Sequence, residues 1–219
     1  MNYTELVTAV SDYSENTFPT ADMNTFIKQA EQRIYNSVQF PSIRKNVTGI
    51  TSTNIKYLAC PSDFLAVYSL AVIDGAGSYE YLLNKDVNFI RQAYPSPTDT
   101  SIPKYYALFG PTVVSNIITN ELSFILGPTP DAAYNMELHY YYYPESIVSA
   151  VNTWLGDNFD SVLLYGTLVE AITYMKGEAD MIALYNTKYG EALALAKRLG
   201  DGMERQDAYR SGQFRQAVT

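Results

Sequence analysis

The chain has 219 residues and a formal net charge of −8, and its 17% of charged residues is below the roughly 25% typical of soluble domains. No basic cluster is longer than Arg44-Lys45 or Lys197-Arg198, which argues against a protein that grips nucleic acid from outside. The N-terminus resembles no secretory signal, and the longest apolar run, residues 64–73, is too short to span a bilayer.

The first forty residues have the periodicity of two helices. Leu6, Val7, Val10 and Tyr13 recur at helical spacing, and a break follows at residues 18–19. A second amphipathic helix is predicted from Thr20, which can cap it, to Pro41, which ends it. Its apolar stripe comprises Phe26, Ile27, Ala30, Ile34 and Val38.

Between residues 47 and 143 the pattern changes to short β-rich runs separated by turn residues. The sequence Asp74-Gly75-Ala76-Gly77 is a hairpin signal, residues 86–93 read as one short helix, and residues 95–101 form a polar loop with Pro95 and Pro97. The single cysteine, Cys60, precludes an intramolecular disulfide and reads as a small buried residue. The predicted strands are 47–50, 56–58, 65–73, 79–83, 105–109, 113–118, 122–126 and 135–142.

The last predicted strand is rich in tyrosine and carries the only histidine, His139. Neither face of this strand is strongly polar, so we expect both to be partly covered. A lone histidine between tyrosines is more typical of a structural hydrogen-bonding residue than of a catalyst. The twenty tyrosines of the chain leave two readings open, an aromatic-rich core or a surface enriched in protein contacts.

Residues 160–176 predict a helix that is apolar over more than one face. Such a helix must be covered on more than one side, inside a bundle or between subunits. Gly177 is predicted to close it in a left-handed conformation, and a second helix follows over residues 181–199. Glu170 is the one acid in the middle of the apolar helix, and we favour a pair across a helix or subunit interface over a catalytic carboxylate.

The pattern as a whole predicts an α+β fold in which a mainly antiparallel β domain is inserted into a helical bundle. Residues 1–40 and 152–199 are assigned to the bundle, residues 41–151 to the β domain, and residues 200–219 to an extended C-terminal arm. The arm is polar and has few apolar residues, so it should not fold alone.

No catalytic constellation stands out in the sequence. A Ser-His-Asp or Cys-His arrangement would need His139, and no G-x-S-x-G elbow accompanies it. Phosphate-binding and dinucleotide-binding glycine patterns are absent, and no Cys/His spacing fits a metal site. The sequence therefore predicts no catalytic residue, no metal and no cofactor.

Several local patterns together resemble one family. They are FIKQAEQRI at residues 26–34, PSDFLAVYSL at 61–70, YLLNKDVNFIRQAYP at 81–95, PKYYALFG at 103–110, FILGPTPDAAY at 124–134, LHYYYYPES at 138–146 and LLYGTLVEAITYMKGEAD at 163–180. In order and spacing they resemble the head-to-tail adaptor proteins of tailed bacteriophages. The layout is similar to the tail tubular A proteins of T7-like phages, over about residues 20–215.

The resemblance implies a virion structural protein, made in the host cytoplasm, that forms a ring, commonly of twelve copies, between the portal and the tail. DNA passes through such a ring without specific binding, and no membrane is involved. The portal contact is expected in the C-terminal arm, at Arg205, Gln206, Asp207, Tyr209, Arg210, Phe214 and Arg215. We expect subunit contacts at Glu170, Tyr174, Tyr141 and Tyr143, and contacts with a tail or nozzle protein at Asp74, Gly75, Pro95 and Pro97.

Two other classes of function stay open from the sequence. One is a small tail-associated hydrolase centred on His139 or Glu170, and the other is a monomeric assembly chaperone. A ring would be much heavier than the 24.5 kDa monomer, whereas both rivals would remain monomers.

Overall fold

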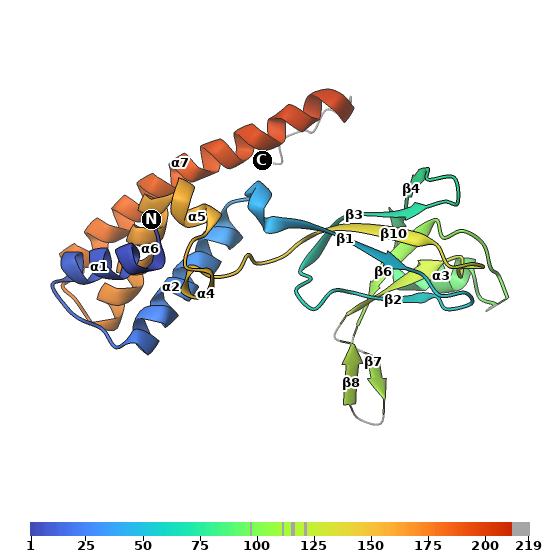
Figure 1. Ribbon diagram of the computed structural model, residues 1–219, viewed down its shortest axis with the longest axis horizontal. Helices are drawn as coiled ribbons and strands as arrows, with labels where there is room; N and C mark the ends of the chain where they lie inside the picture. Colours follow the sequence, from blue (N-terminus) through green and yellow to red (C-terminus); the bar gives the residue numbers. More distant parts are fainter. Residues whose placement is uncertain (97, 111, 115–116, 121, 212–219) are drawn as a thin grey trace. The chain divides into compact units, whose positions relative to one another are not determined.

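The computed structural model describes residues 1–96, 98–110, 112–114, 117–120 and 122–211, with only the backbone described at 112–114, 117–120 and 201–211. The chain divides into two compact units. One combines Met1–Ile43 with Tyr143–Thr219, and the other is Arg44–Tyr142. Helices build the first unit, and strands with one helix build the second (Figure 1), which confirms the predicted α+β class.

Both ends of the chain contribute helices to the first unit. A capping box between Asn2 and Glu5 fixes the start of its first helix. Short connections are expected between antiparallel helices, and four residues, 175–178, separate the two longest C-terminal ones. The helices are α1 (Tyr3–Ser14), α2 (Thr20–Ser37), the 3-10 turn η1 (Pro41–Ile43), α4 (Ile147–Ala150), α5 (Trp154–Asn158), α6 (Asp160–Tyr174) and α7 (Ala179–Ser211).

Helix α6 is the centre of this bundle, and α1, α2, α5 and α7 all contact it (Figure 1). The prediction that this helix is covered on more than one side is confirmed. At Gly166, an added Cβ would lie 3.3 Å from both Ala30 Cβ and Tyr189 Cε2, so the glycine permits close packing of three helices. The buried residues of α6 are Val162, Leu163, Leu164, Gly166, Thr167, Leu168, Val169, Ala171 and Ile172.

The turn after α6 differs from the prediction in one residue. Lys176 has the left-handed conformation, with φ 55°, and Gly177 does not. Gly177 is needed for a different reason, because a Cβ there would lie 2.6 Å from Ile172 Cγ2. Its N–H donates to the Ile172 carbonyl at 3.0 Å, which satisfies one of the last carbonyls of the helix.

The predicted end of the last helix at Leu199 is wrong, because α7 continues to Ser211. Gly200 is buried and its φ is not positive, so it does not close the helix. A Cβ there would lie 3.1 Å from the Gln39 carbonyl oxygen, so the glycine allows close packing against the segment after α2. Residues 203–206, Met-Glu-Arg-Gln, then favour helix. The remainder of the predicted extended arm, residues 212–219, lies outside the described residues.

The second unit contains two four-stranded sheets. The first sheet has the order β1-β10-β3-β4, and every neighbouring pair in it is antiparallel. The second has the order β2-β9-β6-β5, with one parallel pair, β5 and β6. The strands of these sheets are β1 (Arg44–Ile50), β2 (Tyr57–Ala59), β3 (Ala66–Ile73), β4 (Tyr79–Tyr81), β5 (Leu83–Asn84), β6 (Tyr105–Phe109), β9 (Ser123–Gly127) and β10 (Asn135–Tyr141).

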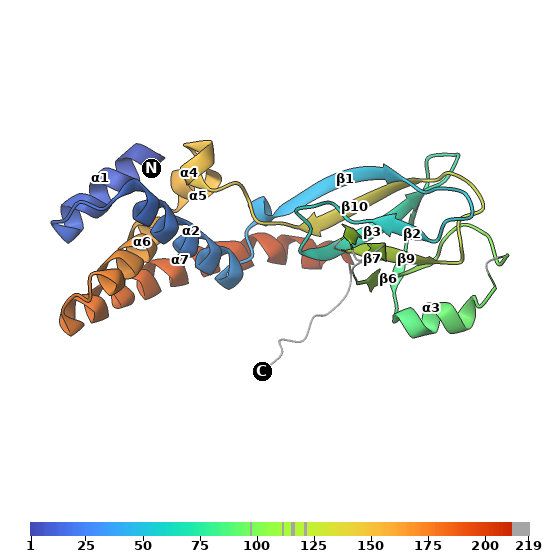
Figure 2. The ribbon, with the colours of Figure 1, turned by 90° about the horizontal axis from the view of Figure 1, so that it is seen from below.

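The two sheets share an apolar core. Leu70 and Leu138 from the first sheet meet Phe124 and Leu126 from the second within one buried cluster. The other face of the second sheet is covered by α3 (Val87–Ala93), whose Ile90 packs against Ala107 and Ile125 (Figure 2). As a result β9 is buried along its whole length.

Two predicted strands are each divided in the structure. The predicted strand 79–83 becomes β4 and β5, which belong to different sheets, because Leu82 between them is buried in the shared core. The predicted strand 113–118 becomes the hairpin β7 (Thr112–Val114) and β8 (Ile117–Asn120). The sequence between these two strands is Ser-Asn, a pair of residue types that favour turns.

The burial of α6 yields a test of the bundle. We expect Leu168→Asp to lower the free energy of unfolding by about 4 kcal/mol or more, because Leu168 is fully buried and the new carboxylate has no partner. Leu195→Asp on α7 is the matched control, since Leu195 is 64% exposed. Urea unfolding followed by circular dichroism measures both. Equal midpoints for the two variants would contradict the central position of α6.

Candidate interaction surfaces

Glu170 forms an ion pair within its own chain. Its carboxylate accepts a hydrogen bond from the guanidinium of Arg33 on α2, and the same guanidinium lies 5.9 Å from the ring centre of Tyr189 on α7. The Glu170 side chain is 16% exposed, at the edge of a shallow polar pocket of about 520 Å³ that includes Gln29 and Asn36. The charge of Glu170 is thus paired without a neighbouring subunit.

Tyr174 lies at the C-terminal end of α6 and is 58% exposed. Its ring packs against Phe26, with centroids 5.1 Å apart, and against Phe18 at 6.5 Å. The hydroxyl donates to a carboxylate oxygen of Asp22 at 3.4 Å. This tyrosine therefore closes an aromatic cluster on one side and presents a ring surface on the other.

Among the side chains of the bundle that the structure describes, Glu31 is the most deeply buried carboxylate, and the sequence analysis did not single it out. It is 3% exposed, and one of its oxygens accepts the N–H of Ile147 at 2.8 Å, at the start of α4. Burial raises the pKa of Glu31, while the hydrogen bonds from Ile147 and Ser146 and the charge of Lys28 oppose that shift. Glu31 lies four residues after Ile27 and three before Ile34, so the sequence places it on the apolar stripe of α2. This spacing could have indicated that Glu31 is buried.

Tyr141 belongs to a cluster of aromatic and basic side chains in the second unit. The guanidinium of Arg44 lies 4.6 Å from the ring centre of Tyr68 and 5.8 Å from that of Tyr141. The ring of His139 lies 4.9 Å from Tyr68. Burial lowers the pKa of His139, the charge of Arg44 lowers it further, and Glu137 opposes both. His139 is therefore neutral at physiological pH and packs as an aromatic ring.

Tyr143 is separated from Tyr141 by the boundary between the two units. It is exposed, and its hydroxyl donates to the side-chain oxygen of Asn36 on α2 at 2.6 Å. The two tyrosines predicted for one subunit interface thus lie in different compact units.

The predicted hairpin turn at Asp74 is confirmed. The Asp74 carboxylate accepts the N–H groups of Ala76 and Ser78, both at 2.8 Å, and Gly77 has φ 86°. These contacts join β3 to β4, and Gly75 is exposed at the tip.

The loop after α3 is held to a neighbouring segment of the second unit. The N–H of Ser101 donates to the carbonyl of Thr129 at 2.9 Å, and the N–H of Thr129 donates to the carbonyl of Asp99 at 3.2 Å. Pro95 begins this loop, and Pro97 lies outside the described residues.

The residues predicted to bind the portal fall at the end of the chain. Five of them lie within α7, where only the backbone is described, and two lie outside the described residues. The first five are Arg205, Gln206, Asp207, Tyr209 and Arg210, and the other two are Phe214 and Arg215.

Catalytic and membrane features were also sought in the described part of the chain. Within it, no group of three or more His, Cys, Asp or Glu side chains could hold a metal ion, and no helix is long and apolar enough to cross a membrane. Cys60 is half-buried against the core shared by the two sheets, and burial raises the pKa of its thiol to about 12, so it is a thiol rather than a reactive thiolate.

An α+β chain whose notable side chains are partly exposed tyrosines held by ring contacts has the character of a structural, interface-forming protein. The chain belongs to the SU10 adaptor protein family, whose family model matches residues 1–216. This family supplies bacteriophage head–tail adaptors, which are structural components of the virion. No curated protein matches the chain.

The contact between Glu31 and Ile147 leads to a stability prediction. Glu31→Ala should lower the free energy of unfolding by about 1–3 kcal/mol, because the buried N–H of Ile147 loses its acceptor. Glu31→Gln should lose less, because its amide oxygen can accept the same hydrogen bond. Chemical denaturation at pH 7 compares the two variants, and equal losses would contradict the role of this hydrogen bond.

A comparison of the natural protein with Glu31→Gln tests the raised pKa of Glu31. A carboxyl with a raised pKa in the folded state contributes stability that is fully present below the unfolded value, near 4.5. That contribution is lost as the pH rises through the folded pKa. The stability of the natural protein relative to Glu31→Gln should therefore fall between pH 4.5 and 7, and a relative rise over that range would contradict the sign.

Proposed function

We propose that this chain forms a ring, of twelve copies, that joins the portal of a tailed phage to its tail and surrounds the DNA passage. The observation that carries the proposal is the family match, which spans 216 of the 219 residues and includes both compact units. A closed ring needs two different surfaces on each subunit that complement each other. The function proposed here is assembly, without a chemical step.

The charge of the chain supports a passive passage for DNA. The net charge of −8 opposes tight binding to phosphates, and a wall that does not bind lets DNA move past it. The DNA contact in this proposal is therefore steric and non-specific.

The portal contact is assigned to the C-terminal end of α7 and the residues after it. Tyr209, Arg210, Phe214 and Arg215 lie within seven residues, and aromatic and arginine side chains are the usual anchors of interfaces. Helix α7 continues to Ser211 and so carries five of the proposed portal-binding residues.

The tail contact is assigned to the polar loops of the second unit. The turn at Asp74 and Gly75 and the loop that includes Pro95 and Pro97 are polar connections on rigid sheets, which suits them to specific contacts. Glu170, Tyr174, Tyr141 and Tyr143 are proposed to lie where subunits meet, with Glu170 already paired to Arg33 in its own chain.

Mass measurement tests the ring. In light scattering of the purified protein, alone and with portal, we expect a species many times heavier than the 24.5 kDa monomer. Mixing with portal is included because a ring can require its template to assemble. A monomer in both conditions would contradict the proposed function.

Truncation tests the portal assignment. A chain that ends at Gly202 keeps Gly200 packed against Gln39, so it should unfold at nearly the same temperature as the full chain. It should lose co-migration with portal on a sizing column, because the proposed anchors are gone. Replacement of Glu204 alone by Ala is the control and should leave binding unchanged. Normal portal binding by the truncated chain would overturn the assignment.

A further inference from the structure

The strand β1 is a long edge strand whose charged residues, Arg44 and Lys45, are confined to its first two positions. It has seven residues, six of them exposed, and its register with β10 runs without interruption. Natural edge strands are blunted by shortness, proline, bulges or charge. Those of the second sheet, β2 and β5, have three and two residues, whereas β1 has no proline and no bulge. This edge is therefore suited to pair with another strand.

One contact shows which residues of β1 direct their backbone N–H and C=O groups toward β10 and which direct them to the open edge. The N–H of Thr51 donates to the carbonyl of Tyr134, directly opposite, at 2.9 Å. Because bonded pairs alternate in an antiparallel ladder, Val47 and Gly49 also bond inward to β10. Asn46, Thr48 and Ile50 then direct their backbone groups outward. Among the described residues, no backbone group pairs with these three on that side.

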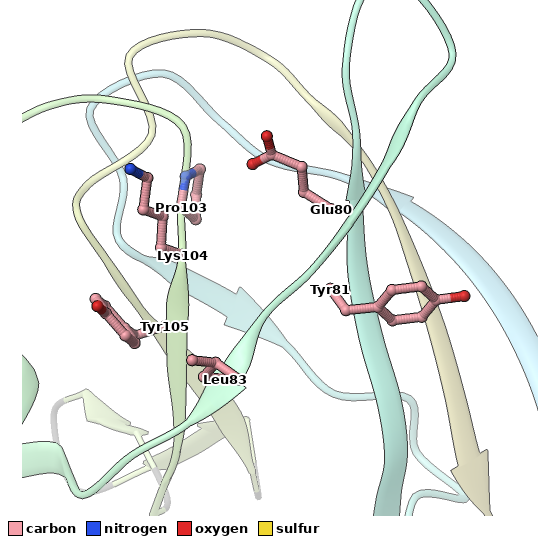
Figure 3. Close-up of a pocket in the computed structure, with 6 residues that line it drawn as sticks. All are labelled: Glu80, Tyr81, Leu83, Pro103, Lys104 and Tyr105. Carbon is pink, nitrogen blue, oxygen red and sulfur yellow. The ribbon is translucent and has the colours of Figure 1, made fainter. Parts of the chain in front are cut away.

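The opposite edge of the same sheet is β4. The N–H of Leu82 donates to the carbonyl of Leu70 at 2.9 Å, and that of Asp74 donates to Ser78 at 3.0 Å. By the same alternation Glu80 bonds inward to β3, and Tyr79 and Tyr81 direct their backbone groups outward. Figure 3 shows Glu80 and Tyr81 pointing to opposite sides of this strand.

The two edges fit each other in direction and in phase. The sheet is fully antiparallel with four strands, so β1 and β4 run in opposite directions. Val47 lies opposite Leu138 and Glu80 lies opposite Val72, and both partners are in the shared core. The outward-bonding residues of both edges therefore carry side chains on the face away from that core. In an antiparallel sheet with an odd number of strands, the two edge strands would run in the same direction, and their outward-bonding residues would lie on opposite faces.

We propose that β1 of one subunit pairs antiparallel with β4 of the next, which extends one sheet through neighbouring copies. The inference rests on the proposed ring and names the surfaces that close it. The joint is head-to-tail, since each copy offers one β1 and one β4, as a closed ring requires.

Side chains at the two edges support this pairing. Ile50, Tyr79 and Tyr81 are half or more exposed, and all three lie on the same face of the extended sheet. A pocket of about 330 Å³ lies next to the β4 edge, and Figure 3 shows the residues that line it, Glu80, Tyr81, Leu83, Pro103, Lys104 and Tyr105.

Proline substitutions remove the outward N–H of either edge and leave every inward hydrogen bond in place. Thr48→Pro should keep the circular dichroism spectrum of the natural protein and abolish the ring measured by light scattering with portal. Tyr81→Pro should do the same from the other edge. Thr48→Val and Tyr81→Val keep the N–H, so both control variants should still assemble.

Mixing the two proline variants tests the head-to-tail geometry. Thr48→Pro retains an intact β4, and Tyr81→Pro retains an intact β1, so the equimolar mixture should form one joint and a heterodimer. A mixture that stays monomeric would overturn the proposal, and dimers of Tyr81→Pro alone would mean that β1 pairs with another β1. Assembly of Thr48→Pro alone would also overturn it while leaving the proposed ring intact.

Amide hydrogen exchange gives a test that needs no substitution. β4 offers two outward-bonding residues, so in the assembled natural protein two neighbouring outward amides of β1, that of Thr48 and that of Asn46 or Ile50, should exchange at least about tenfold more slowly than in the monomer. Fast exchange in the assembled ring would contradict strand pairing. Protection that appears only after a tail protein is added would assign the edge to that protein. Absence of any ring with portal would count against the proposed function itself.

Discussion

Helix α6 can exist only if other helices cover it on several sides, because its apolar residues occupy more than one face. Four helices supply that cover, and they come from both ends of the chain. The chain must therefore return to the bundle after it has built the second unit. Small residues make the return possible, since Gly166 and Gly200 let α2, α7 and the segment after α2 approach closely. The bundle is thus the element that allows a β unit to be inserted without loss of a common helical core.

Different interactions fix the segment that leaves the bundle after α2 and the segment that returns to it before α4. Phe40, at the exit, packs against Trp154 and Phe159 with ring centroids 5.2 and 5.1 Å apart. The re-entry segment is held by polar contacts, through Tyr143 to Asn36 and through Ile147 to Glu31. Apolar contacts tolerate small shifts, whereas a buried carboxylate fixes one N–H in place.

Local patterns in the sequence were sufficient for the helices, for most strands and for the turn at Asp74, because their causes lie within a few residues. Features that depend on distant neighbours were missed. Gly177 and Gly200 look like helix stops, but each is there because another group approaches within about 3 Å of its missing Cβ. Residues 79–83 read as one strand because nothing local shows that Leu82 crosses between sheets. The spacing of Glu31 placed it on the apolar stripe of α2, but its hydrogen-bond partner could not be predicted, since Ile147 is 116 residues away.

The most direct test of this account is electron cryomicroscopy of the intact phage particle at a resolution that shows side chains. We expect a ring of copies of this chain at the head–tail junction, below the portal, with the end of each α7 against portal and β1 of each copy beside β4 of the next. Density for the chain elsewhere in the particle, or a mature particle that lacks it, would contradict the central claim that it is a virion adaptor.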